Sequence, residues 1–170
     1  NCVLNERKIS GVEITSTADV PGGTGLGSSS TFTVGLLNAL NCYQGKYMSK
    51  GKLAEKACEI EIQKLGNPIG KQDQYAAAFG GLNFIRFHQD GEVSVSPVVM
   101  QPETYQELQK NLVMFYTGDT RSANTILKEQ KNNMSATDKT TNLRHMCALA
   151  EEMLVALEKN QINSFGDLLN

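Results

Sequence analysis

A glycine-rich stretch near the start of the chain has the residue types of an anion-binding loop. PGGTGLGSSS, from Pro21 to Ser30, contains four glycines and three serines but no lysine. Glycine permits positive φ and close approach of the backbone to a ligand. N–H groups at a helix start attract an anion together with the helix dipole, and serine hydroxyls can contact phosphate or Mg²⁺. The stretch therefore predicts a phosphate cradle in which a metal replaces the usual lysine.

Two familiar nucleotide-binding patterns do not describe this loop. Gly22 and Gly27 have the spacing of the G-x-x-x-x-G-K-[ST] loop, but Ser28 stands where that loop has lysine. The dinucleotide pattern G-x-G-x-x-G fails because Ser30 replaces its third glycine. The alternative to a cradle is a glycine-rich turn in which a serine only caps the next helix. The candidate nucleotide-binding residues are Pro21, Gly22, Gly23, Thr24, Gly25, Leu26, Gly27, Ser28, Ser29 and Ser30.

Glu61 is a carboxylate on an otherwise apolar helical face. Ala54, Ala57, Cys58 and Leu65 define that face, and Glu61 follows Ala54 at i+7. A carboxylate on such a stripe has to be paired, bound to a metal or placed at a cleft. The alternative, a stripe edge that reaches solvent, stays open at this point.

Asp73 lies at the expected start of a short, alanine-rich helix, in the stretch GNPIGKQDQYAAAFGG. One interpretation is an acidic residue that the helix dipole favours at this position. The other is a group that orients or deprotonates a hydroxyl nucleophile. The residue alone does not separate the two.

Composition narrows the class of protein. The 170 residues suffice for one domain or two small ones, and 40% apolar residues can build a packed core. A formal net charge of -2 argues against nucleic acid or an anionic membrane as the main partner. No apolar run reaches the roughly 18 residues that a membrane span needs. Four scattered cysteines predict neither a zinc site nor a disulfide framework, and they favour a cytoplasmic location.

Hydrophobic periodicity predicts a mixed α+β chain. Alternation over residues 11–17 indicates a strand, and apolar residues every fourth position from Ser28 to Leu40 indicate a helix after the glycine loop. Further elements are expected as helices at 50–65 and 72–79, a hairpin of 82–87 and 92–99 around Asp90-Gly91, a buried strand at 111–117 and a long helix at 137–159. The irregular order of strands and helices favours α+β over a doubly wound sheet.

The glycine loop resembles the P-x-x-x-G-L-G-S-S-A signature of the GHMP kinases and departs from it only at Ser30. The segment GKQDQYAAAFGG is similar to the stretch of galactokinase-like members that carries a catalytic aspartate. In those members a glutamate twelve residues earlier binds Mg²⁺, and 73 − 12 gives Glu61. The resemblance thus implies ATP and Mg²⁺, with Asp73 as the catalytic residue and Ser29 and Glu61 as metal ligands.

The resemblance also implies a fold and a substrate. A ribosomal-protein-S5-like ATP lobe is expected over residues 1–98, and the start of a ferredoxin-like lobe over residues 99–170. GKQDQYAAAFGGLNFIRF and FYTGDTRSANTIL look most like the sugar-1-kinase branch. That branch implies phosphoryl transfer to the anomeric hydroxyl of a heptose 7-phosphate, with Gln72 and Arg121 as candidate substrate contacts. For Arg121, an exposed loop position is the alternative.

Two other functions stay open at this stage. One is a GHMP kinase for fucose, galactose, mevalonate or another alcohol; the other is a non-catalytic nucleotide-binding or regulatory protein on the same fold. The 170 residues contain neither the N-terminal motif nor the C-terminal glycine-rich motif of the family. We therefore expect a fragment that is a poor kinase by itself. The expected partner is a small sugar or sugar phosphate, and a homodimer is left open.

Overall fold

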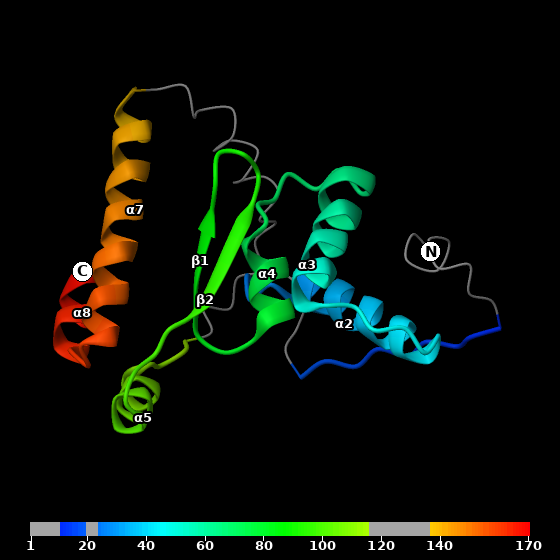
Figure 1. The fold of residues 1–170 in the computed structure, drawn as a ribbon, viewed down its shortest axis with the longest axis horizontal. Helices are drawn as coiled ribbons and strands as arrows, with labels where there is room; N and C mark the ends of the chain where they lie inside the picture. Colours follow the sequence, from blue (N-terminus) through cyan, green and yellow to red (C-terminus); the bar gives the residue numbers. More distant parts are fainter. Residues whose placement is uncertain (1–10, 20–23, 116–136) are drawn as a thin grey trace. The chain divides into compact units, whose positions relative to one another are not determined.

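The computed structural model describes residues 11–19, 24–115 and 137–170. The chain divides into two compact units, residues 1–81 with 118–128 and residues 82–117 with 129–170. In the described residues the first unit is helical, whereas the second combines a two-stranded sheet with helices (Figure 1). This mixture confirms the predicted α+β class. The division into two kinase lobes at residue 98 stays a prediction.

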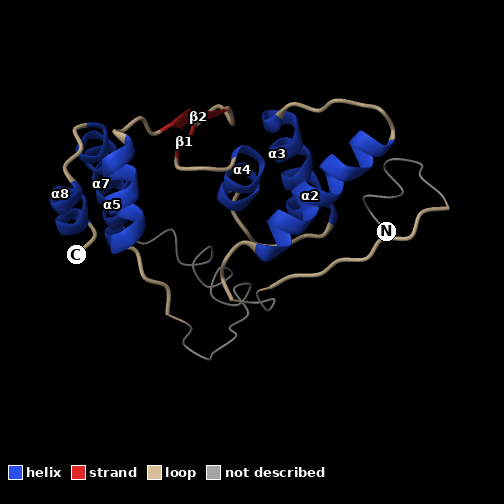
Figure 2. Ribbon diagram, turned by 90° about the horizontal axis from the view of Figure 1, so that it is seen from below, coloured by secondary structure: helices blue, strands red, loops and turns tan. Residues whose placement is uncertain are grey.

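Three helices pack together in the first unit. They are α2 (Ser28–Tyr43), α3 (Lys50–Cys58) and α4 (Gln72–Phe79), and the π-helical turn η1 (Glu59–Lys64) directly follows α3. Figures 1 and 2 both show α2, α3 and α4 side by side. The core between them consists of Val34, Leu37, Leu40, Leu53, Ala57 and Ile60. The spacing of three along α2 puts its members on one face, and their burial is the main stabilising term.

Side-chain contacts at the helix ends fix how α3 and α4 meet. Ser49 caps α3, and its hydroxyl accepts from the backbone N–H of Lys52 at 3.4 Å. The Lys50 ammonium donates to the carbonyl of Phe79 at 2.7 Å. Because a helix C-terminus carries unsatisfied carbonyls and partial negative charge, this lysine satisfies the end of α4. The start of α3 is thereby held at the end of α4.

The three helices predicted for this unit are confirmed. The helix that opens on the serines extends to Tyr43, and the short one spans the predicted residues 72–79. The helix predicted at 50–65 is continuous, but its second part winds as a π-helix. A π turn is rare and is frequent at functional sites.

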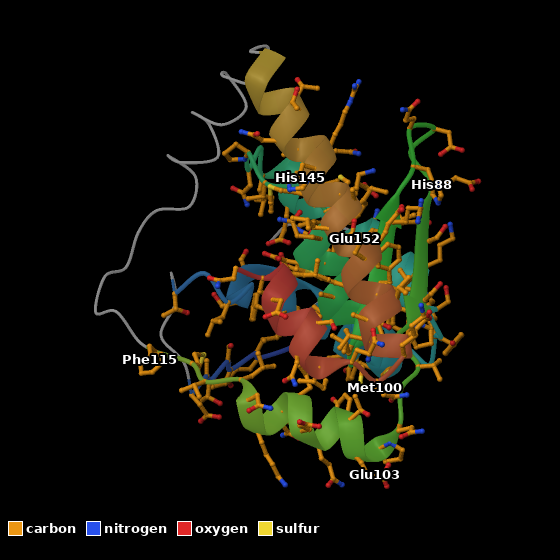
Figure 3. The ribbon with its side chains drawn as sticks, turned by 90° about the vertical axis from the view of Figure 1, so that its left-hand side faces the viewer. His88, Met100, Glu103, Phe115, His145 and Glu152 are labelled. Carbon is orange, nitrogen blue, oxygen red and sulfur yellow. The ribbon has the colours of Figure 1, made fainter. Side chains whose placement is uncertain are left out.

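The second unit contains the predicted hairpin. Strands β1 (Asn83–Phe87) and β2 (Val93–Pro97) pair antiparallel, with Ile85 opposite Val95. His88, labelled at the hairpin turn in Figure 3, lies 2.6 Å from the hydroxyl of Ser94. The turn that follows includes Gly91 with φ 91°. A positive φ of this kind explains why the Asp-Gly pair was a usable hairpin signal.

Three helices complete the described part of the second unit. They are α5 (Pro102–Asn111), α7 (Thr137–Glu158) and α8 (Ile162–Leu168), and α7 confirms the predicted long helix. Asn160 has φ 60° between α7 and α8, and its side-chain oxygen accepts from Gln101 N–H and Thr104 Oγ1, both at 2.8 Å. Asparagine tolerates this left-handed conformation better than other non-glycine residues. One residue thus turns the chain and holds the start of α5.

Two strand predictions are wrong in the described residues. Residues 12–18 form neither helix nor strand, and residues 112–115 follow α5 without regular structure. Leu112, Val113, Met114 and Phe115 are each more than 60% exposed, so the apolar run is not buried as predicted. The strand signal failed because a strand also needs a partner for its backbone groups, which periodicity does not supply.

Among the described helices none is long and apolar enough to cross a membrane.

We predict that Leu37→Ala destabilises the first unit by about 2–5 kcal/mol, because Leu37 is 0% exposed and its loss leaves a cavity between three helices. The matched control is Leu65→Ala, since Leu65 is 54% exposed at the end of η1. Urea unfolding followed by circular dichroism measures both. Equal losses for the two variants would contradict the assigned core.

Candidate active site

The described part of the glycine loop leads directly into the start of α2 through two glycines with positive φ. Residues 20–23, with Pro21, Gly22 and Gly23, lie outside the described residues. Gly25 and Gly27 have φ 78° and 67°, and α2 begins directly afterwards at Ser28. The first N–H groups of a helix have no partner within the helix, so the loop presents donors to an anion. The predicted order of glycine loop and helix start is confirmed.

Glu61 is fully buried and is held by side chains from two other elements. It is 0% exposed, in the π turn η1. Ser29 donates to its Oε1, Ser30 donates to Oε2 at 2.7 Å, and the amide of Gln74 donates to Oε2 at 2.6 Å. The serines belong to the first turn of α2 and Gln74 to α4. The predicted choice between a solvent-facing edge and a paired carboxylate is thereby decided for the paired state.

The π turn brings Glu61 to this position. Its wider winding is closed by the N–H of Leu65, which donates to the carbonyl of Ile60 at 2.9 Å. Ile60 and Glu61 are neighbours in sequence, yet they are 2% and 0% exposed. Ile60 belongs to the apolar core, whereas Glu61 contacts the serines. One turn of helix thus supplies both the core and the polar cluster.

Asp73 lies against the start of α2. A Cβ built on Gly27 would stand 3.4 Å from Cβ and Cγ of Asp73 and 3.5 Å from its Oδ2. Asp73 is itself exposed, in the first turn of α4. The structure therefore brings this carboxylate to the glycine loop, 46 positions away (73 − 27). Any side chain at position 27 would crowd it and would also face an unfavourable φ.

The two glutamines that flank Asp73 differ in their exposure and in their contacts. Gln72 is exposed, and its side chain folds back over Gly70. Gln74 is 0% exposed and was missed from the sequence, although a glutamine on an alanine-rich helix beside Asp73 was a usable signal. Arg121, the other candidate substrate contact, lies outside the described residues.

Cys58 is a buried thiol next to the polar cluster. Burial raises its pKa to about 11, the Lys71 ammonium opposes this shift, and the Glu61 carboxylate adds to it. Since the thiolate is the reactive form, Cys58 is inert at neutral pH.

In the part of the chain that the structure describes, no group of three His, Cys, Asp or Glu residues could hold a metal. A metal here would need the Ser29 hydroxyl and the Glu61 carboxylate together with ligand oxygens.

A family model covers the residues of this arrangement. The GHMP kinases N terminal domain matches residues 1–81, which include the loop, Glu61 and Asp73. Over residues 1–81 the chain belongs to the GHMP kinase family. The resemblance that the two motifs carried is thereby confirmed.

Relatives that match the chain include sugar kinases and mevalonate kinases. The D-glycero-alpha-D-manno-heptose 7-phosphate kinase of Campylobacter jejuni is 38% identical over 117 residues, 69% of this chain and 34% of that protein. The L-fucokinase/L-fucose-1-P guanylyltransferase of Bacteroides fragilis is 30% identical over 165 residues, 94% and 17% of the two chains. The crystal structure of a D-glycero-D-manno-heptose 1-phosphate kinase from Bacteroides thetaiotaomicron has a TM-score of 0.72 at 30% identity. This chain is covered completely in that comparison and spans 50% of the relative.

We predict opposite effects for two glycine substitutions in one stretch. Gly27→Ala should destabilise the protein by about 1–2 kcal/mol, because φ 67° is costly for alanine and the new Cβ meets Asp73. Gly35→Ala is the control: no atom lies within 4 Å of its Cβ, and it sits inside α2. Alanine should gain about 0.5–1 kcal/mol there. Urea unfolding decides, and a stabilised Gly27→Ala variant would refute the assigned loop geometry.

We predict that Cys58 resists alkylation in the folded protein. Cys42 and Cys147 are exposed and should react with iodoacetamide at least about tenfold faster at pH 8, because Cys58 is buried and its thiolate is suppressed. Mass spectrometry of the timed reaction measures each site, and urea-unfolded protein provides the control. Equal rates for the three sites would show that Cys58 is accessible.

Proposed function

We propose that this chain supplies the phosphate loop, the metal carboxylate and the catalytic carboxylate of an ATP-dependent sugar kinase. The γ-phosphoryl group of ATP moves to a sugar hydroxyl, with the anomeric hydroxyl of a heptose 7-phosphate as the acceptor. The heptose kinases among the relatives support a heptose phosphate, and the described geometry supports the phosphoryl transfer.

One observation carries the proposal: two carboxylates that lie far from α2 in the sequence are both found at the start of this helix. Glu61 contacts Ser29 and Ser30 in the first turn of α2, and Asp73 lies against Gly27 immediately before it. The first turn of α2 is also where backbone donors and the helix dipole favour phosphate. Phosphoryl transfer needs such a combination of anion binding, charge neutralisation and a group facing the nucleophile.

The donor set fits Mg²⁺. The Ser29 hydroxyl and Glu61 Oε1 are hard oxygen donors that already contact one another. Mg²⁺ is usually bound by one or two protein oxygens and completes its shell with water and substrate phosphates. A bound Mg²⁺ would neutralise the charge that develops on the phosphates of ATP. The absence of a three-residue acidic or thiol cluster in the described chain is compatible with this kind of site.

Asp73 has the position of a group that faces the acceptor. Its carboxylate is exposed, whereas Glu61 is buried. The exposed acid is therefore assigned to the acceptor sugar and the buried acid to the metal. The Asp73 carboxylate accepts a hydrogen bond from the sugar hydroxyl, orients it towards the phosphorus and receives its proton as the new P–O bond forms. The bond between the γ-phosphorus and the β,γ-bridging oxygen breaks at the same time, and ADP leaves. Because the transition state is loose, orientation contributes more than proton removal.

The test is Asp73→Asn in the full-length product of the gene. We expect kcat for a heptose 7-phosphate to fall about 10²-fold while the KM for ATP changes little, because the group acts on the acceptor in the transition state. Asp167→Asn is the control, since Asp167 is an exposed aspartate on α8. Steady-state kinetics at saturating Mg²⁺ measures both variants.

Unchanged kcat for Asp73→Asn would return Asp73 to a helix-start role. A parent protein that binds ATP but turns over none of heptose 7-phosphate, fucose, galactose and mevalonate would instead favour the non-catalytic nucleotide-binding protein. The two results are distinguishable because the second is read from the unmodified protein.

A further inference from the structure

The two oxygens of Glu61 are held differently. Oε2 accepts two hydrogen bonds, from Ser30 and Gln74, whereas Oε1 is contacted by Ser29. Ser30 and Gln74 are 2% and 0% exposed, and Ser29 is exposed. The side of the carboxylate that carries Oε2 is thus enclosed by protein donors, and the Oε1 side faces the residue that borders solvent.

The side-chain amide of Gln74 satisfies the carboxylate of Glu61 but leaves its own oxygen without a hydrogen bond. Its Nε2 donates to Glu61, while its Oε1 is buried without a hydrogen-bond partner in the described residues. A buried unsatisfied acceptor is unfavourable, typically by about 1–3 kcal/mol. Turning the amide over would place its oxygen against the carboxylate, so the negative charge of Glu61 dictates the orientation. A functional role for the hydrogen bond to Oε2 of Glu61 would explain why the protein retains this unfavourable buried oxygen.

Ser30 is the second member of this pair, which we call the Oε2 clamp. It is the one residue by which the loop departs from the P-x-x-x-G-L-G-S-S-A pattern, and its hydroxyl makes a contact that alanine lacks. These two donors match in number the two lone pairs of Oε2. The clamp therefore leaves Oε1 as the carboxylate oxygen with capacity for a further ligand.

We propose that the Oε2 clamp makes Glu61 a one-oxygen metal ligand and thereby selects Mg²⁺ over Ca²⁺. The inference rests on the proposed function, in which Ser29 and Glu61 bind the metal. Mg²⁺ requires a compact octahedral shell at about 2.0–2.1 Å, so its neighbouring ligands stand about 3 Å apart, which is hydrogen-bond distance. Ca²⁺ takes six to eight oxygens and commonly both oxygens of a carboxylate. Occupying Oε2 withholds that mode from Ca²⁺.

The experiment removes the clamp one donor at a time. Ser30→Ala deletes a hydroxyl with little loss of volume, and Gln74→Met keeps the length of the side chain without its donor. Gln63→Met is the matched control, because Gln63 is an exposed glutamine in η1. Calorimetric titration of ATP into each full-length protein gives a Kd with saturating Mg²⁺ and with saturating Ca²⁺. Thermal unfolding in EDTA checks the folding of every variant.

We expect Ser30→Ala and Gln74→Met each to weaken Mg²⁺-supported ATP binding about tenfold and to leave Ca²⁺-supported binding unchanged or tighter. The Kd measured with Ca²⁺ divided by the Kd measured with Mg²⁺ should therefore fall in both variants. The Gln63→Met control should keep the parental value of this ratio. If both metals lose the same factor, the clamp is only structural and the inference is wrong. If Gln74→Met fails to fold, Ser30→Ala decides by the same ratio. Absence of ATP binding by the parent with either metal would overturn the proposed function as well.

Discussion

The site depends on one constraint: a carboxylate that is completely buried must receive hydrogen bonds from its surroundings. An unpaired buried carboxylate costs several kcal/mol. Glu61 avoids this cost through donors on the start of α2 and on α4. Bonds to a charged acceptor contribute roughly twice as much as neutral ones. The requirement to satisfy Glu61 therefore fixes the serines of the glycine loop and the first turns of α4 relative to η1.

This constraint also couples the buried side of the site to its exposed side. Asp73 and Gln74 are adjacent on α4, and they face in opposite senses: Gln74 is 0% exposed and contacts Glu61, whereas Asp73 is exposed beside Gly27. A helix that is held by its buried glutamine presents its exposed aspartate in one orientation. For the proposed role of Asp73 this positioning matters, because a 1 Å displacement of a reacting group can lower a rate by about 10²-fold.

Local signals were sufficient for four of the described helices and for the hairpin, and insufficient for the two other predicted strands. Apolar residues every third or fourth position predicted α2, α3, α4 and α7, because a helix satisfies its own backbone and needs only one apolar face. The Asp90-Gly91 pair predicted the hairpin through its turn chemistry. The strands expected at 11–17 and 111–117 were wrong in the described residues, because alternation or an apolar run does not specify a pairing partner. The π turn had no sequence signal, since it arises where a helix accommodates tertiary contacts.

For the site, the sequence by itself determined which residues are the candidates. The glycines, the serines and Glu61 stood out by residue type and spacing, because a glycine-rich loop and a carboxylate on an apolar face are local features. Asp73 became a candidate through the resemblance of its stretch to a kinase motif. Only the tertiary structure decided how they are used: Gln74 joins the cluster, Oε2 of Glu61 is enclosed and Asp73 meets Gly27. These contacts join residues more than ten positions apart, and their geometry follows from helix packing and burial, which no single stretch of sequence encodes.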